Sequence, residues 1–289
     1  MHVPRSAGLA AALGLLAWVG LGAVPAASAA VRSCTVTDAS THARYTSLQA
    51  AVLAASPGAT LLVGGTCIGT TEIQQNLTVT GQGVSPTLNG DDQGSVLIID
   101  EGASVTINRL TITRGGGPDE VGGGIYSQGT AIVNDTIVTG NSAPEGGGGI
   151  WNDGTMTLNN DIVTGNSGPY GGGIYNDMTL TLNGLTSVIH NAAGVDGGGI
   201  ANGGYEGSAG GTVTLNNLAA ADFNTASGDG GGIYNYEGTV TFHNRAAADF
   251  NIAKGGPDSG GGIYNAGTLN GAVAGRNVFG DKPDDIAGT

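Results

Sequence analysis

The sequence predicts an all-β protein built as a parallel β-helix, a solenoid whose coils contribute short strands to stacked sheets. The first observation is a hexapeptide, GGGIYN or a close variant, that starts at Gly122, Gly147, Gly171, Gly197, Gly230 and Gly260. The second is a following piece, such as TMTLNN, that alternates polar and apolar residues with the period of a strand. The third is the Gly and Asn between these pieces, where the chain turns and often needs a positive φ. Three short strands and three turns in about 25 residues make one solenoid coil.

Stacking of coils places each residue on its counterpart in the next coil, about 4.8 Å away. The hexapeptide predicts an inward core ladder of Ile125, Ile150, Ile174, Ile200, Ile233 and Ile263. A corner ladder, whose amides hydrogen-bond along the axis, is predicted from Asn141, Asn166, Asn191, Asn224, Asn251 and Asn277. An aromatic row on the outside is predicted from Tyr126, Trp151, Tyr175, Tyr234 and Tyr264, with Ala201 interrupting it.

The remaining segments suggest how the solenoid begins and ends. We expect a signal peptide at residues 1–29 and a single domain at 30–289. The domain would consist of an N-terminal cap at 30–58, irregular first coils at 59–121, regular coils at 122–274 and a C-terminal cap at 275–289. In Tyr45–Gly58 the spacing of Leu48, Val52 and Leu53 predicts a short helix that covers the apolar end of the solenoid.

Residues 1–29 have the three parts of a secretory signal: Arg5, an apolar run from Leu9 to Val24, and small residues up to a cleavage site near Ala29. A membrane anchor is the alternative reading. Export favours a disulfide between Cys34 and Cys67, with two reduced thiols as the alternative. We therefore expect a secreted, extracellular and monomeric protein with no membrane-spanning segment in its mature chain.

The charge balance is acidic, with 9 Lys and Arg against 23 Asp and Glu and a net charge of −14. Such a field repels nucleic acid, anionic lipid and polyuronate chains. Carboxylates also precede the triple glycines, at Asp119, Glu120, Glu145, Asp196, Asp229 and Asp258. They are either a solvated acidic edge or a row of weak Ca²⁺ sites, because hard cations need several oxygen ligands.

Insertions occur in the turns of the repeat rather than in its strands. The longest predicted insertion is GGYEGSAGG at Gly203–Gly211. Insertions at the turns of a solenoid form loops on its flank, which is a common place for binding.

The helical segment, the run SPGATLLVGGTCIGTTEIQQNLTVTGQG and the GGGIYN coils together resemble a known family. They are similar to secreted bacterial right-handed parallel β-helix proteins of the pectin-lyase-like superfamily, in particular those with polymorphic-outer-membrane-protein-type repeats. The segment TSLQAAV at Thr46–Val52 resembles a degenerate CSLREA segment that lacks its Cys and its Arg-Glu pair. The resemblance spans residues 34–289 and implies a right-handed, single-stranded parallel β-helix, but no particular activity.

The superfamily includes polysaccharide lyases and hydrolases. A lyase needs a base, often Arg or Lys, and an Asp cluster that holds Ca²⁺. A hydrolase needs two or three carboxylates on neighbouring coils. Arg109 and Arg114 have no evident acidic cluster, and the Asn-Thr-Asp and Gly-His-Gly motifs are absent. Adjacent pairs such as Asp91-Asp92 and Asp284-Asp285 point apart within a strand. Lys254 and Lys282 lie in loops, and His190 and His243 are expected at the surface.

Two functions remain open from the sequence. The first is an exported, non-enzymatic surface or matrix protein for adhesion, glycan binding or structure, with a glycan or a host or cell-surface component as its partner. The second is a polysaccharide-acting enzyme, a lyase or a glycoside hydrolase, that lacks the known motifs. No catalytic residue and no cofactor beyond weak Ca²⁺ is predicted.

Overall fold

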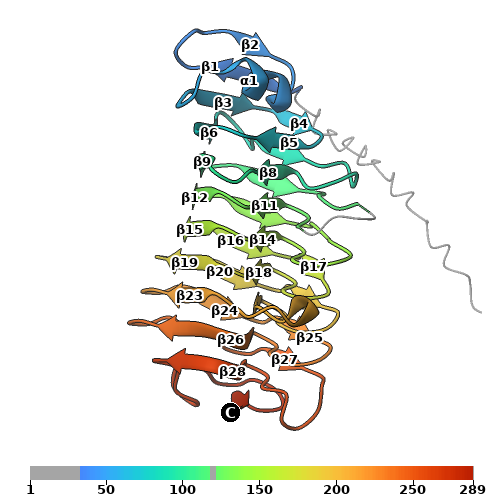
Figure 1. The fold of residues 1–289 in the computed structure, drawn as a ribbon, viewed down its shortest axis with the longest axis vertical. Helices are drawn as coiled ribbons and strands as arrows, with labels where there is room; N and C mark the ends of the chain where they lie inside the picture. Colours follow the sequence, from blue (N-terminus) through green and yellow to red (C-terminus); the bar gives the residue numbers. More distant parts are fainter. Residues whose placement is uncertain (1–32, 118–121, 289) are drawn as a thin grey trace, which may run out of the picture. The chain divides into compact units, whose positions relative to one another are not determined.

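The computed structural model describes residues 33–117 and 122–288, so the predicted signal peptide lies outside the described residues. Over these residues the chain is a parallel β-solenoid whose coils follow one another in sequence order (Figure 1). Its two short helical elements are α1 (Leu48–Ala54) and the 3-10 turn η1 (Tyr205–Gly207). The all-β parallel solenoid predicted from the repeat is confirmed.

The largest sheet has 18 strands and receives two strands from most coils. The first set contains the hexapeptide strands and is made of β5 (Thr71–Ile73), β8 (Leu97–Ile99), β11 (Ile125–Ser127), β14 (Ile150–Asn152), β18 (Ile174–Asn176), β22 (Ile200–Asn202) and β29 (Ile286–Gly288). The second set is made of β3 (Thr60–Gly64), β6 (Leu77–Gly81), β9 (Ser104–Asn108), β12 (Thr130–Asn134), β15 (Thr155–Asn159), β19 (Thr179–Asn183) and β23 (Thr212–Leu215). Two long strands, β26 (Ile233–Phe242) and β28 (Ile263–Asn270), run through both sets and so join them into one sheet.

Two smaller sheets complete the wall. The seven-stranded sheet is made of β4 (Thr66–Ile68), β7 (Thr87–Asn89), β10 (Thr111–Thr113), β13 (Ile137–Thr139), β16 (Ile162–Thr164), β20 (Ser187–Ile189) and β24 (Ala220–Asp222). The four-stranded sheet is made of two-residue strands: β17 (Ser167–Gly168), β21 (Ala192–Ala193), β25 (Thr225–Ala226) and β27 (Ile252–Ala253). A regular coil therefore has the three predicted strands and, in several coils, a very short fourth.

The predicted isoleucine ladder forms the centre of the core. Parallel pairing joins the six isoleucines in register, and the series continues to Ile286 in the last strand. All six predicted side chains are completely buried. A coil cannot bury this side chain alone, because its cover is the same side chain in the coils above and below.

The predicted corner ladder is present from Asn141 to Asn251. Each side-chain amide donates to the Oδ1 of the next asparagine at 3.0–3.2 Å, and each Oδ1 also accepts the backbone N–H of the asparagine before it. Asn277 was wrongly included in this ladder. The residue that follows Asn251 there is Asp281, whose Oδ1 accepts the backbone N–H of Asn251. Asn277 instead donates to the backbone oxygens of Ala246 and Gly271.

Two further asparagine ladders were missed in the sequence. One follows the hexapeptide strands inside the core and consists of Asn152, Asn176, Asn202, Asn235 and Asn265. The other follows the second set of strands on the outer side and consists of Asn108, Asn134, Asn159, Asn183 and Asn216. The signal was available, because the hexapeptide itself ends in Asn in most copies.

Helix α1 covers the N-terminal end as predicted, and it occupies only Leu48–Ala54 of the predicted segment Tyr45–Gly58. Ser47 caps α1 by accepting the N–H of Ala50, and Leu48, Ala51 and Val52 are buried. Leu53, expected on the covering face, is 78% exposed. Strand β1 (Thr35–Asp38) pairs antiparallel with β2 (Arg44–Tyr45) and with β3, and the predicted disulfide joins Cys34 to Cys67 of the first coil.

The C-terminal segment, predicted to cap the solenoid at residues 275–289, instead continues it. Strand β29 pairs in parallel with β28, and Lys282 forms a bridge with Ile252 of the four-stranded sheet. Val278 is completely buried, like Val138 and Val163 at the same place in earlier coils. The last described residues therefore form one more partial coil.

Candidate ligand-binding groove

A groove of about 410 Å³ lies on the flank of the solenoid, where the hexapeptide strands turn into the second set of strands. It crosses four consecutive coils and is lined by Glu101–Ser104, Gln128–Thr130, Asp153–Thr155 and Met178. The walls therefore offer carboxylates, one side-chain amide and a row of hydroxyl groups. Among these lining residues there is no Lys, Arg or His.

Neighbouring coils approach each other closely at two glycines that line the groove. A Cβ added at Gly129 would lie 2.5 Å from the backbone oxygens of Ala103 and Asp100. A Cβ at Gly154 would lie 2.0 Å from the oxygen of Gly129. No larger residue fits at either place, so the neighbouring side chains of Gln128 and Asp153 form the rim.

Asp153 is held in place by the aromatic row of the adjacent strands. Its carboxylate accepts the indole N–H of Trp151 and, at 3.3 Å, the hydroxyl of Tyr126 from the preceding coil. Burial raises the pKa of Tyr126 to about 12, and the charge of Asp153 adds to this shift. Tyr126 therefore stays protonated and remains a donor to Asp153 across the physiological range.

The aromatic row predicted on the outside is covered at Trp151 and Tyr175 and partly exposed at Tyr126, Tyr234 and Tyr264. Trp151 is 6% exposed and Tyr175 is completely buried. Their ring centroids lie 4.4 Å apart, and Tyr126 meets Trp151 edge-on at 6.5 Å. Trp151, Tyr175 and Ala201 form a small apolar cluster separate from the core, and Tyr126 packs against it, whereas Tyr234 and Tyr264 stack on each other at 5.4 Å.

The cover comes from the insertion Gly203–Gly211, which we call the flank loop. Tyr205 of this loop meets Trp151 edge-on at 5.3 Å and Tyr170 at 5.8 Å. Ser208 is 2.7 Å from the hydroxyl of Tyr175 and donates to Asp177 at 3.1 Å. Ala201, which interrupts the row, is completely buried in the same cluster, against which Tyr205 of the loop packs.

The structure describes four of the six carboxylates predicted as a Ca²⁺ row. Asp119 and Glu120 lie outside the described residues. Glu145, Asp196, Asp229 and Asp258 lie in the predicted turns, and Asp196 accepts the backbone N–H of Asp229 at 2.7 Å. Burial, and next the charge of Asp229, raise the pKa of Asp196. Within the described ranges, no three His, Cys, Asp or Glu side chains group together closely enough to hold a metal.

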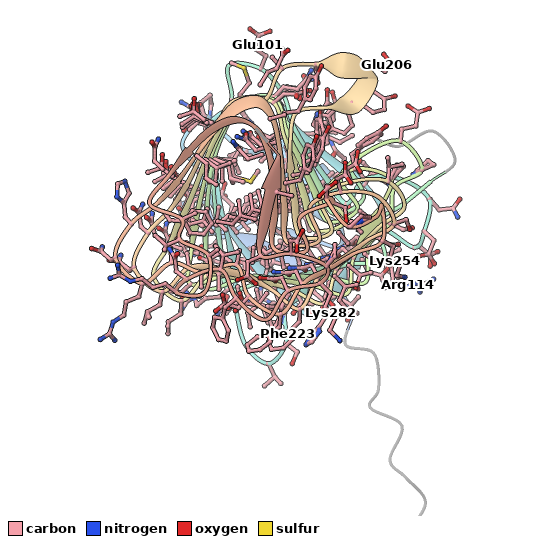
Figure 2. The ribbon with its side chains drawn as sticks, turned by 90° about the horizontal axis from the view of Figure 1, so that it is seen from below. Glu101, Arg114, Glu206, Phe223, Lys254 and Lys282 are labelled. Carbon is pink, nitrogen blue, oxygen red and sulfur yellow. A yellow bond between two sulfur atoms is a disulfide. The ribbon has the colours of Figure 1, made fainter. Side chains whose placement is uncertain are left out.

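The other charged residues considered for catalysis do not line the groove, and three of them form ion pairs with one another. Asp91 and Asp92 both face Arg114, at 3.3 and 2.6 Å, contrary to the expectation that Arg114 has no acidic partners. Both aspartates have a positive φ and sit in a turn, so the alternation of a strand does not separate them. In the view along the solenoid, Lys254, Lys282 and Arg114 lie away from Glu101 of the groove (Figure 2).

An exposed aromatic row on the corner before the four-stranded sheet was not anticipated. Phe223 and Phe250 stack at 5.2 Å, with His190 and Phe279 at the two ends. His190, expected at the surface, is exposed there, as is His243 elsewhere. Phe223 and Phe250 have φ of 56° and 57°, where earlier coils have Gly140 and Gly165. This strained conformation for a bulky residue is offset by the ring stacking between coils.

Comparison with known families gives one match. Residues 135–153 match the family described as the Chlamydia polymorphic membrane protein repeat. The matched segment contains the corner asparagine Asn141, the triple glycine and Trp151, and it ends at Asp153 of the groove. No curated protein and no solved structure matches the chain. No helix in the described part of the chain is long and apolar enough to cross a membrane.

Proposed function

We propose that this protein is an exported bacterial surface protein whose rigid solenoid binds a glycan chain in the flank groove, without catalysis. The match to the polymorphic membrane protein repeat supports a surface location. The observation that carries the proposal is the groove itself, whose rim repeats polar side chains from coil to coil along the solenoid. Asp153, fixed by Trp151 and Tyr126, is an oriented acceptor for a sugar hydroxyl.

The charge of the groove selects among glycans. Glu101 and Asp153 line it without a basic residue, so uronate and sulfated chains are repelled. Neutral and amino-sugar chains have no such penalty, and their hydroxyl or ammonium groups are donors for these carboxylates. A linear chain parallel to the solenoid axis would meet equivalent groups about every 4.8 Å.

The test is a glycan array followed by titration of the best binder with matched variants. Gln128→Ala removes an exposed amide from the groove, and Gln93→Ala removes an exposed amide that does not line it. We expect Gln128→Ala to weaken binding by roughly five- to tenfold, the value of one to two hydrogen bonds, and Gln93→Ala to leave it unchanged. No binding to any neutral or amino-sugar glycan, or equal effects of both variants, would contradict the proposal.

A glycoside hydrolase remains the second candidate, favoured by one observation. Glu101 and Asp153 are two carboxylates in one groove, which is the minimum for that chemistry. Reducing-sugar release from any bound glycan, abolished by Asp153→Asn, would establish this activity and replace the non-enzymatic assignment.

A further inference from the structure

The flank loop covers the aromatic row in a way that an ordinary turn does not require. Neighbouring coils make the same connection with far fewer residues: Asp177-Met178 joins β18 to β19, and Tyr236–Gly238 lies between the two halves of β26. The extra residues of the flank loop fold outward and back over Trp151 and Tyr175. Figure 2 shows Glu206, at the tip of the loop, on the same side of the solenoid as Glu101 of the groove.

The loop has glycines at both ends, where the N–H groups of Gly203 and Gly210 donate to the backbone oxygens of Asn176 and Tyr236. Gly203 and Gly204 have φ of 79° and 97°, and Gly210 and Gly211 close the loop on the other side. Between these glycines, its tip is tied to the row beneath by Ser208 and by Tyr205, whose N–H donates to the hydroxyl of Tyr175. Glu206 adopts a left-handed backbone with φ of 50°. A segment with terminal glycines and a strained tip has the properties of a hinged cover.

The row beneath the loop is continuous with the groove. Asp153 lines the groove and also holds Trp151 and Tyr126, while Asp177, at the equivalent turn of the next coil, holds Tyr175 and Ser208. Met178 marks the end of the groove, and the backbone of Gly211 packs against its carbonyl oxygen. The loop therefore stands where a chain that follows the groove toward the C-terminal coils would reach the aromatic rings.

We propose that the flank loop is a movable cover over a second binding subsite, an aromatic platform of Tyr126, Trp151 and Tyr175 that receives the apolar faces of sugar rings. The inference rests on the proposed glycan function and names the subsite that extends the groove. Aromatic faces beside oriented carboxylates suit a pyranose ring, which has a face of C–H groups and a rim of hydroxyls. In the closed state the Ser208 hydroxyl donates to Asp177 Oδ1. In the open state the same oxygen accepts a hydrogen bond from a sugar hydroxyl.

Intrinsic fluorescence tests the cover without a ligand, because Trp151 is the one tryptophan of residues 30–289. The main variant deletes residues 204–209, which leaves three glycines between Asn202 and Thr212. This link has the length of Tyr236–Gly238 in the next coil. We expect a red-shifted emission and at least a twofold rise in acrylamide quenching. Ser142→Ala, at an exposed serine outside the loop and the named strands, is the control and should leave both unchanged.

Titration with the glycan that binds the groove tests the platform. When a cover must open before the ligand binds, the apparent affinity is the intrinsic affinity multiplied by the fraction of molecules that are open. Deletion of the cover should therefore tighten binding several-fold. Adding Tyr175→Ala to the deletion should remove that gain and return the affinity to that of the groove alone, because Tyr175 bonds Asp177 rather than Asp153 of the groove. Tyr205→Ser keeps the length of the loop and should give a smaller gain in affinity. This variant replaces the deletion if the deletion variant does not fold.

The outcomes separate the two proposals. Unchanged quenching in both loop variants, or a gain in affinity that survives Tyr175→Ala, would overturn the cover and platform while leaving the groove intact. Weak binding in Gln128→Ala together with no effect of the loop variants supports the groove and rejects the cover. No glycan binding with increased quenching would reject the proposed function, and with it the ligand of the platform.

Discussion

In the middle of the corner ladder, Asn191 uses every polar atom of its side chain, whereas at the end of that ladder Asp281 leaves one oxygen unpaired. Asn191 accepts from Asn166 and donates to Asn224 and to the backbone oxygen of Val163. Asp281 accepts from Asn251 with Oδ1, but its Oδ2 is buried without a partner. Repetition thus satisfies a buried amide from both sides, and an end has only one side.

The inner ladder shows the same contrast at its beginning. Asn152 donates to Asn176, but the position before it holds Ser127, whose hydroxyl is too short to continue the series. Among the described residues, Ser127 Oγ and Asp281 Oδ2 are the buried side-chain polar atoms that have no hydrogen-bond partner. Both therefore lie at ladder ends, and the interior of each ladder should contribute more stability than its ends.

The largest expected difference between interior and end concerns the isoleucine ladder. Ile174→Asp places a carboxylate between Ile150 and Ile200 with no partner, and we expect it to disrupt several coils. Ile286→Asp, in the last described strand and half-buried, should fray only that strand. Ile174→Val should cost about 0.5–1.5 kcal/mol. Thermal unfolding followed by circular dichroism measures all three, and equal losses for the two Asp variants would refute the contrast.

A smaller effect is expected from removing one ladder amide. Asn191→Ala leaves the buried N–H of Asn166 unpaired, at a cost of about 1–3 kcal/mol, and removes one donor from the carbonyl of Val163. Asn277→Ala is the matched control, because Asn277 lies outside the ladder and its bonds are partly exposed. Urea denaturation should show a loss for Asn191→Ala several times that of Asn277→Ala. Comparable losses would mean that the stacked amides have no special weight.

These residues also show what the sequence could and could not predict. The isoleucine ladder follows from the repeat because the same residue recurs at the same place. Asn277 was misplaced because the nearest Asn was chosen, although Val278-Phe279-Gly280-Asp281 aligns with Val138-Thr139-Gly140-Asn141. The burial of Trp151 and Tyr175 depends on how the flank loop folds back, and the groove depends on side chains from four coils. Neither has a local signal in the sequence.

The ladder end should make stability depend on pH. Burial raises the pKa of Asp281 to about 7, with the charges of Asp285 and Asp249 as lesser causes. A folded pKa above the unfolded value of 3.8 means that the folded state binds the proton more tightly. The resulting stabilisation is complete below pH 4 and is lost as the pH rises through about 7.

Asp281→Asn should remove this loss. The amide can donate where Oδ2 is unpaired, and the ladder pattern indicates the backbone oxygen of Ala248 as its acceptor. We expect a gain of about 1 kcal/mol at pH 8 and little change at pH 4. Burial also raises the pKa of Asp161 to about 7, so only the difference between variant and parent reports Asp281. A difference that does not vary with pH would contradict the role of Asp281.

The beginning of the inner ladder offers a similar but smaller gain. Ser127→Asn would extend the ladder by donating to Asn152 Oδ1, which now accepts only a 3.3 Å bond from Gly154. Because Ser127 is completely buried, part of the gain is lost to crowding, and we expect less than about 1 kcal/mol. A variant less stable than the parent in urea would show that the end is closed by packing rather than by a missing amide.

The smallest effect is expected at the acidic edge. Asp196 and Asp229 lie on consecutive coils, and a bound divalent cation would relieve their repulsion. Millimolar Ca²⁺ should therefore raise the melting temperature slightly more than NaCl of equal ionic strength. Asp196→Asn combined with Asp229→Asn should shrink the difference. Identical effects of the two salts would leave the row as a solvated edge.

The most direct test of the contrast is a reciprocal exchange between interior and end, measured by urea unfolding at pH 8. Asn191→Asp puts a carboxylate where a donor is required on two sides, and Asp281→Asn puts an amide where a donor is missing. We expect a loss of about 2–4 kcal/mol for the first variant and a gain for the second. Changes of the same sign in both variants would contradict the contrast.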